Sequence, residues 1–446
     1  MNITKIRNRL KSCLCFLILT NVTTVNAQIF QNDTLKIMSY NTLNYGFAAT
    51  TQCPALITAN KHNYLKTIIQ YSDPDILGLV KMNATPSSFS TDSVIQNVLD
   101  SLCSGCYGHS QFTNLSGYTK CNMLYFKLSK IGYVSTSTIY SADPNISDIN
   151  LIKLFYRDPN ISINLDTIFI NIILVHLKSG TNNDTTRANE IAGVMSWLNN
   201  NVFLPGNYII MGDFNVNSST ESCFQELISS SNPNTTYFDP ENQLGNWAAN
   251  PSLYSKVLTQ STRKIDPGDC GSTGGMDSRF DHILCSDPII QGNHSIRYLS
   301  GSFEVLGQDG NHVNKSLLDL PADTIVPPQV LNSLYYMSSH LPVSIKVEIS
   351  SPVANSIKSK SNTSDQFIVY PNPVDNIIHI KSFESESEQL KIILRTSLGN
   401  NILERQYLSS KNGNDFQIDV SFITPGFYFL EIRTKELKKL FKLKIN

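Results

Sequence analysis

The chain has 446 residues, more than one hydrophobic core usually supports, so we expect a large domain and a smaller one. Hydrophobic residues make up 41% of the chain, as in ordinary folded proteins. After an N-terminal segment with four basic residues and no acidic one, 31 basic and 36 acidic residues remain, a net charge of −5. This balance argues against a protein that binds long polyanions through its net charge alone.

The first 27 residues predict a secretory signal. Basic residues between Lys5 and Lys11 precede the apolar run from Cys13 to Leu19, and Val25-Asn26-Ala27 forms a small-residue cleavage site. A membrane anchor is the alternative, but the apolar run is far shorter than the roughly 20 residues that a spanning helix needs. We therefore expect an exported protein with no transmembrane segment in its mature part.

Residues 28–350 alternate between short β-rich runs and amphipathic helical patterns, which indicates sheets covered by helices. The pattern predicts buried strands at 37–40, 76–80, 169–175 and 208–211. It predicts helices around residues 64–69 and 94–102, and a third helix after Asp184 as its N-cap, with Ile191, Val194, Met195 and Leu198 on the inner face.

From residue 351 to residue 366 the composition changes to serine, lysine and asparagine, which predicts a linker. Residues 367–446 then contain short alternating patterns separated by turns. This second pattern predicts a small all-β sandwich.

Seven of the nine cysteines lie after residue 27, and because seven is odd at least one thiol is unpaired. Export makes disulfides chemically possible. Cys103 and Cys106 are either a local bridge or a redox pair, and a plain structural role is favoured because no thioredoxin-like context surrounds them. A zinc site would need a second pair at similar spacing, which the sequence lacks.

The segment Met211-Gly-Asp213-Phe-Asn215 follows a predicted buried strand. It places a carboxylate and an amide on the same side of an extended segment, where the two can orient a water molecule. By itself such a segment is often only a turn. Phosphodiester hydrolysis needs this kind of group together with a divalent ion and donors for the transition state.

Further polar residues stand near the ends of predicted strands, in the order Asn41, His176, Asp281, His340. The ordered set, above all His176-Leu-Lys-Ser-Gly180 and Gly212-Asp-Phe-Asn215, resembles the endonuclease/exonuclease/phosphatase superfamily over residues 34–348. The resemblance implies a four-layer α/β/β/α sandwich and hydrolysis of phosphodiesters, such as nucleic acids, with Mg²⁺ or Mn²⁺. We expect these side chains and Lys81 to converge on one rim of the sandwich.

The resemblance also implies individual roles. Asp213 would be the general base, Asn215 would position water and phosphate, and His340 would contact the phosphate while paired with Asp281. Other implied site residues are His176 as a second phosphate-side histidine, Asn41 in the metal environment and Tyr125 as a site tyrosine. Arg187 and Glu190 follow on the next helix, and we interpret them as part of a solvated helix face.

Two positions depart from the superfamily pattern. Lys81 stands where the metal-binding glutamate is expected, and Ser339 stands where an aspartate precedes the last histidine. A lysine ammonium repels a divalent ion. An alignment error is unsupported because Leu77, Leu79 and Lys81 share one strand face, and Asp75 lies too far upstream to replace the ligand.

The C-terminal region carries a second resemblance. Tyr370-Pro-Asn-Pro373, Pro425-Gly-Phe-Tyr428 and a lysine-rich last segment are similar to the type IX secretion sorting domain of Bacteroidetes. The resemblance implies passage across the outer membrane by the type IX machinery, with the domain removed or exchanged for a surface anchor. A solvated basic tail without function is the alternative explanation for the lysines.

Three interpretations follow for the large domain. It is a degenerate domain that binds phosphate-bearing ligands with weak or no hydrolysis, an active secreted metal-dependent phosphodiesterase with altered ligation, or a surface structural or adhesive module. Residues 239–275, rich in glycine, proline and asparagine, are expected to border the cleft and to select the substrate. Nucleic acid, phospholipid and sugar phosphate all remain open as substrates.

Overall fold

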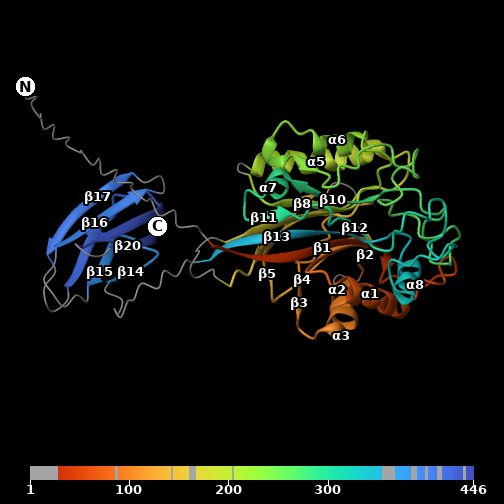
Figure 1. Ribbon diagram of the computed structural model, residues 1–446, viewed down its shortest axis with the longest axis horizontal. Helices are drawn as coiled ribbons and strands as arrows, with labels where there is room; N and C mark the ends of the chain where they lie inside the picture. Colours follow the sequence, from red (N-terminus) through yellow and green to blue (C-terminus); the bar gives the residue numbers. More distant parts are fainter. Residues whose placement is uncertain are drawn as a thin grey trace, which may run out of the picture. The chain divides into compact units, whose positions relative to one another are not determined.

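The chain folds into two compact units, residues 1–355 and 356–446. Figure 1 shows the computed structural model. The structure describes residues 29–85, 89–141, 144–159, 167–202, 205–353, 367–382, 389–396, 400–408, 414–434 and 438–446. The predicted signal at residues 1–27 lies outside these ranges.

The N-terminal unit contains a seven-stranded sheet with the order β11-β13-β1-β2-β4-β3, and β12 pairs with β13 outside this path. In its centre β1 runs parallel to β2 and antiparallel to β13. Its strands are β1 (Ile29–Tyr45), β2 (Ile76–Asn83), β3 (Tyr107–His109), β4 (Lys120–Lys127), β11 (Ile296–Tyr298), β12 (Glu304–Val305) and β13 (Val343–Val353).

A second sheet of six strands has the order β5-β6-β7-β8-β10-β9. The pair β7 and β8 is parallel, and β10 runs antiparallel to β8. The strands are β5 (Ile131–Tyr140), β6 (Ile149–Tyr156), β7 (Phe169–His176), β8 (Tyr208–Asp213), β9 (Tyr237–Phe238) and β10 (Asp281–Ser286).

The two sheets pack face to face through a core of apolar side chains from both. Gly78 on β2 marks how close they come, because a Cβ atom there would lie 2.7 Å from side-chain atoms of both Leu174 and Met211 on the other sheet. Any larger residue at position 78 would therefore force the ends of these two side chains to shift.

Helices cover both outer faces, with α1, α2, α3 and α8 on one side of the sheets and α5 and α6 on the other (Figure 1). The predicted four-layer α/β/β/α sandwich is therefore confirmed. The helical segments are α1 (Thr58–Ser72), α2 (Phe89–Val94), η1 (Ile95–Leu99), α3 (Asp100–Leu102), α5 (Asp184–Asn201), α6 (Ser222–Ile228), η2 (Pro233–Thr235), α7 (Asp287–Gln291) and α8 (Pro328–Met337).

Three details differ from the sequence expectations. The second predicted helix is interrupted by η1, a π-helical turn. Asn183, not Asp184, is the N-cap residue of α5, and its side chain donates to Ser179 O and does not cap the helix. Strand β13 continues to Val353, past the expected domain end, because residues 351–353 pair with residues 29–31. The rest of the predicted linker, 354–366, lies outside the described residues.

The C-terminal unit is a small β-sandwich, as predicted. A sheet of order β14-β15-β18 and one of order β17-β16-β19-β20 share one apolar core. Their strands are β14 (Phe367–Tyr370), β15 (Ile377–Ser382), β16 (Gln389–Thr396), β17 (Asn401–Leu408), β18 (Asn414–Asp419), β19 (Gly426–Arg433) and β20 (Lys438–Ile445).

Two disulfides form in the N-terminal unit. Cys53 pairs with Cys270, and Cys103 pairs with Cys106, which agrees with the local-bridge alternative. Among the described residues three further cysteines are free, and all three are buried: Cys121, Cys223 and Cys285. Within the described ranges, no helix has the length and apolarity needed to cross a membrane.

Candidate functional site

The strand register brings the predicted polar residues to one rim of the sandwich. His176 ends β7 opposite Asp213 at the end of β8, because these strands are parallel. Asp281 begins the antiparallel strand β10 and also pairs with Asp213. Asn41 lies in β1 of the other sheet, and His340 comes shortly before β13. Five side chains from distant parts of the sequence therefore meet where the strands end.

Direct contacts join these residues. Asn41 Nδ2 donates to Asp213 Oδ2 at 2.7 Å, and His340 Nδ1 lies 2.8 Å from Asp281 Oδ2. Nε2 of His340 and Nε2 of His176 each lie 3.8 Å from Asp213 Oδ2. The carboxylate of Asp213 is thus the centre of the cluster.

Asn215 closes the turn after Asp213. Its backbone N–H donates to Asp213 Oδ1 at 3.0 Å, and its side-chain amide donates to Leu177 O at 2.9 Å. The residue has a φ of 52°, a left-handed conformation that asparagine tolerates better than most residues. Asn215 therefore fixes Asp213 and ties the ends of β7 and β8 together.

Burial dominates the proton chemistry of the cluster. It raises the pKa of Asp213 to about 6, a shift that the neighbouring His340 and Lys81 limit. It also raises the pKa of Asp281 and lowers that of His340, so this pair holds one proton between its two members near neutral pH. Burial and the charge of Lys81 lower the pKa of His176 well below its usual range, so His176 is neutral.

Lys81 lines the same cleft as His176, Asp213 and His340, a cavity of about 260 Å³. The strand is irregular here, because the register of β2 shifts beyond Leu79 and Lys81 has a φ of 61°. The regular alternation of side chains that would place Leu77, Leu79 and Lys81 on one strand face therefore ends at this bulge. Lys81 nevertheless lines the cleft. Burial lowers the pKa of Lys81, and repulsion by Lys120 adds to this effect.

The ammonium of Lys81 acts on the carboxylates only at a distance. Asp213 and Asp281 are near enough to raise the pKa of Lys81, but within the described ranges no carboxylate lies within 4.0 Å of its Nζ. Lys81 therefore forms no direct ion pair with a carboxylate in this part of the chain. Lys120 and Lys178 do not line this cavity, but their charges act on it: the charge of Lys120 lowers the pKa of Lys81, and the charge of Lys178 lowers that of Lys120.

Three of these residues form a set that could hold a metal ion. Ligand atoms of Asp213, Asp281 and His340 all lie within 4.8 Å of one another. Oδ1 of Asp281 is buried without a hydrogen-bond partner in the described structure, so it is available as a ligand. Two carboxylates and an imidazole suit Mn²⁺ or Zn²⁺. Both amide atoms of Asn41 are already engaged, one by Asp213 and one by the N–H of Leu43.

Arg187 and Glu190 are not solvated, contrary to the sequence interpretation. Both are fully buried. Arg187 forms a salt bridge with Glu221 and donates to the carbonyls of Lys178 and Gly180, while Glu190 accepts from the N–H of Lys178. The reason is that the loop after β7 would leave polar backbone groups unsatisfied without them. The pair holds that loop, and with it His176, in place.

Two other predicted residues lie away from the cleft lining. Tyr125 is fully buried in the core on β4, with its ring 6.5 Å from that of His109, and it does not line the cavity. Ser339 is also fully buried, and its hydroxyl has no hydrogen-bond partner in the described structure. The position where an aspartate was expected therefore contributes no charge.

The sequence did not single out Gln260, whose Nε2 lies 2.5 Å from Nε2 of His340. Gln260 and Ser272 line the cleft, which agrees with the prediction that residues 239–275 border it. A buried charged cluster lies in the same segment. Arg263 binds both oxygens of Asp269, and Lys61 lies 3.8 Å from Asp269 and donates to two backbone carbonyls.

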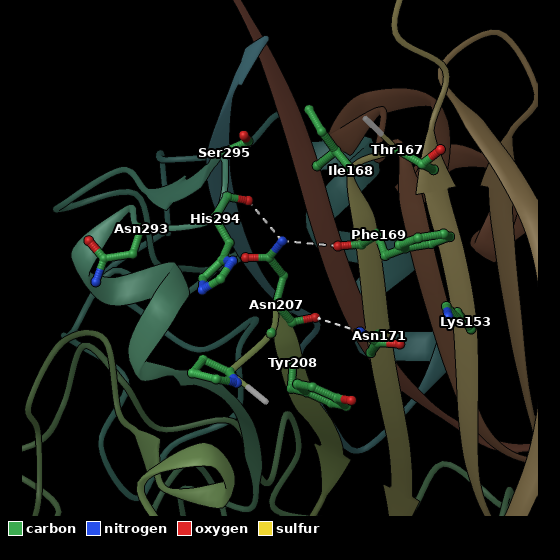
Figure 2. A pocket seen from close by; sticks show the side chains of 12 residues that line it. Lys153, Thr167, Ile168, Phe169, Asn171, Asn207, Tyr208, Asn293, His294 and Ser295 are labelled. Atoms are coloured by element: carbon green, nitrogen blue, oxygen red, sulfur yellow. Dashed lines mark hydrogen bonds between the residues drawn. The ribbon is translucent and has the colours of Figure 1, made fainter. Parts of the chain in front are cut away.

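A second cavity, of about 590 Å³, lies at the opposite end of β7 and β8 (Figure 2). Asn207 joins its walls by donating to the carbonyls of Phe169 and His294. The ammonium of Lys153 lies 4.2 Å from the centre of the Phe169 ring. None of the predicted site residues lines this cavity, so the cleft around Asp213 remains the candidate site.

Comparison with protein families identifies the C-terminal part of the chain. Residues 368–446 match the family described as "Secretion system C-terminal sorting domain", which confirms the sorting domain predicted at residues 367–446. No curated protein sequence matches this chain.

Solved structures similar to this chain include endonuclease/exonuclease/phosphatase proteins. One is a family member from Bacteroides thetaiotaomicron, with 15% identity, a TM-score of 0.44, and 72% of this chain and 99% of the other covered. A mannosyl-6-phosphatase from the same organism has 14% identity and a TM-score of 0.42, covering 70% and 99%. The human Nocturnin catalytic domain with bound sulfate has 15% identity and a TM-score of 0.42, covering 72% and 97%.

Proposed function

We propose that the N-terminal sandwich binds phosphate-bearing ligands and hydrolyses phosphodiesters weakly or not at all. The chain joins this endonuclease/exonuclease/phosphatase-like sandwich to a secretion sorting domain. The observation that carries this proposal is the position of Lys81. Its ammonium shares the cleft with Asp213 and His340, in the place where the resemblance expects a carboxylate that binds the metal.

The charge of Lys81 opposes a divalent ion and favours an anion. A cation beside the Asp213–Asp281–His340 set repels Mg²⁺ by Coulomb interaction, which a buried site screens poorly. Lys81, Lys120 and Lys178 together attract the negative oxygens of a phosphate ester. Neutral donors in the cleft lining, Ser179 and Thr181, can complete the hydrogen bonds to such a ligand.

Contacts within the protein account for the positions of Asp213, Asp281 and His340, so these positions do not by themselves imply catalytic turnover. Asp213 is held by Asn41 and Asn215, and the Asp281–His340 pair is internally satisfied at Oδ2 and Nδ1. A metal ion, if it bound to Asp213, Asp281 and His340, would polarise a phosphoryl oxygen and activate water. The chain's own residues would then orient the ester through the three lysines and the neutral His176.

The sorting domain directs the protein to secretion or surface attachment. We further propose that residues 1–27 are a Sec signal and that the type IX machinery then carries the chain across the outer membrane. The first 27 residues have the three-part order of such a signal.

An active secreted phosphodiesterase with altered ligation is the second candidate. The three ligand atoms within 4.8 Å of one another favour it, because they could bind an ion without the missing glutamate. Both candidates place the ligand in the same cleft, and they differ in whether the metal-loaded protein turns over.

The test uses the mature chain, residues 28–446. We expect little Mg²⁺- or Mn²⁺-dependent hydrolysis of DNA, RNA or bis(p-nitrophenyl) phosphate, and we expect calorimetry to detect binding of inorganic phosphate that Lys81→Met weakens at least about tenfold. Robust hydrolysis that a chelator and Asp213→Ala both abolish would overturn the proposal in favour of the active enzyme.

A further inference from the structure

Lys81 differs from an ordinary buried lysine in having no bound partner. Within the described residues its Nζ forms no salt bridge, and only its backbone N–H has a hydrogen bond, to Asn122 Oδ1 at 3.4 Å. The side chain is partly exposed and lines an open cleft. The amine can therefore be reached by a small molecule without first breaking a contact of the protein.

Lys61 shows the contrast within the same domain. Its Nζ donates to the carbonyls of Leu43 and Met337 at 3.2 and 2.6 Å and lies 3.8 Å from Asp269, and the residue is only 2% exposed. Burial lowers the pKa of Lys61 to about 7. It also lowers the pKa of Lys81, so both lysines lose their ammonium proton at a lower pH than an exposed lysine does. Of these two lysines, Lys81 alone has both a lowered pKa and access from the cleft.

We propose that Lys81 is a carbonyl-reactive amine, which condenses with a small aldehyde that carries a phosphate group to form an imine in the cleft. A desolvated lysine next to another cation is the arrangement that activates this side chain as a nucleophile. Lys120 supplies a cation whose charge acts on Lys81, and the charge of Lys178, which acts on Lys120, adds to the attraction of the phosphate.

The chemical step balances without any further reactant. The neutral amine, having released its ammonium proton to solvent, attacks the carbonyl carbon and forms a C–N bond. The carbonyl oxygen takes up the two protons that the attacking nitrogen loses, and it leaves as water when the C=N bond of the imine forms. The reaction is reversible, and it neither oxidises nor reduces either partner.

The imine proposal rests on the proposed function in one respect: the anion-binding cleft would recognise the phosphate group of the aldehyde. The cleft volume of about 260 Å³ admits a molecule of a few heavy atoms. Glycolaldehyde phosphate is therefore a suitable probe, and glycolaldehyde without the phosphate is its matched control.

The experiment incubates the mature chain with glycolaldehyde phosphate and sodium cyanoborohydride, which reduces an imine to a stable secondary amine, and locates the adduct by peptide mass spectrometry. We expect Lys81 to be labelled at least about tenfold faster than exposed lysines such as Lys264 and Lys346. Lys61 should stay unlabelled because it is enclosed. Glycolaldehyde alone should label Lys81 more slowly.

Matched variants separate access from fold. Lys81→Met should remove the adduct, Lys81→Arg should remove it while keeping the positive charge, and thermal unfolding should show that both variants are folded. Lys120→Met should slow labelling of Lys81 at neutral pH, because it removes the neighbouring cation.

The outcomes distinguish the two proposals. Labelling spread over surface lysines, or found on Lys61 before Lys81, would overturn the imine proposal. If inorganic phosphate binds in calorimetry but Lys81 is not labelled preferentially, the imine proposal fails and the anion site stands. If Lys81 is labelled but phosphate neither binds nor competes, the imine stands and the anion-binding proposal fails.

Discussion

The side-chain amide of Asn41 donates a 2.7 Å hydrogen bond to Oδ2 of Asp213. The two residues lie on different sheets, Asn41 on β1 and Asp213 on β8, and both are almost fully buried. This bond therefore crosses the sandwich at its rim, and it orients the carboxylate that faces Lys81 and His340. Because water has little access to this carboxylate, hydrogen-bond donors such as the Asn41 amide are needed to stabilise its charged form.

The pH dependence of stability should report the burial of Asp213. Its pKa is raised from 3.8 to about 6, so the fold favours the protonated form, and the stabilisation present at low pH is lost as the pH rises through about 6. Asp213→Asn should leave the free energy of unfolding unchanged near pH 4 and raise it by up to about 3 kcal/mol at pH 8. Urea unfolding at both pH values measures this difference.

Asp266 provides a control of opposite sign. It is exposed and accepts hydrogen bonds from the N–H groups of Gly268, Asp269 and Cys270, which hold its pKa below the usual value. Asp266→Asn should therefore lower the melting temperature at pH 8 more than at pH 3. A stabilisation by Asp213→Asn that is equal at pH 4 and pH 8 would contradict the burial explanation.

Metal affinity should rise when the acidic residues of the superfamily pattern are restored. Lys81→Glu removes the repelling cation, and Ser339→Asp adds a carboxylate near the Asp213–Asp281–His340 set. We expect the double variant to bind Mn²⁺ more tightly than the wild type in calorimetry, and we expect any gain in hydrolysis to be smaller because neighbouring groups also orient metal ligands.

Lys81→Met removes the charge that repels Mn²⁺ without adding a metal ligand, so it separates these two effects of Lys81→Glu. It should improve Mn²⁺ binding less than Lys81→Glu does. Ser339 is fully buried, so each variant is first checked by thermal unfolding. Equal Mn²⁺ affinity of the wild type and the folded double variant would mean that Lys81 does not control the metal site.

The buried pair of Arg187 and Glu221 should stabilise the loop that carries His176. Arg187→Met leaves Glu221 without its partner and frees the carbonyls of Lys178 and Gly180, so we expect a loss of about 2–4 kcal/mol in the free energy of unfolding. Weaker phosphate binding should accompany this loss because the cleft wall moves.

Arg297 on the surface is the matched control, since it pairs with Glu348 at 2.8 Å but is 57% exposed. Arg297→Met should change the free energy of unfolding by less than about 1 kcal/mol and leave phosphate binding unchanged. If the two substitutions cost the same, the network around Arg187 does not hold the loop.

Export should depend on the C-terminal domain. A chain that ends at Gln366 lacks the segment that matches the sorting domain, so we expect it to fold and to accumulate in the periplasm instead of reaching the surface or the medium. Fractionation with an antibody against the N-terminal domain measures this distribution. Surface display of the truncated chain at the level of the full chain would contradict a sorting role.

The sequence predicted the parts of the fold that repeat a local pattern. The buried strands at 37–40 and 208–211 and the inner face of α5 follow from periodicity, because each element buries one face whatever its partners are. The positions of Asp213 and His176 at strand ends followed in the same way, and the strand register then placed them side by side.

The buried charges could not be predicted from the sequence. Arg187, Glu190 and Lys61 lie on helices, where charged residues usually face solvent, and their partners lie on other segments: the loop before α5, Glu221 and Asp269. Periodicity describes one element at a time, so it contains no information about those partners. The bulge at Lys81 was missed for the same reason, since it arises from neighbouring strands that shift in register.

The pairing of β1 with β13 makes the folding of the N-terminal domain depend on its last residues. The two strands match over eleven positions, from Ile29 with Val353 to Ser39 with Val343. Until β13 joins the sheet, β1 has one open edge whose backbone groups can pair with another molecule. A chain that is cut short anywhere before β13 should therefore aggregate, so the last strand of this domain protects the first one.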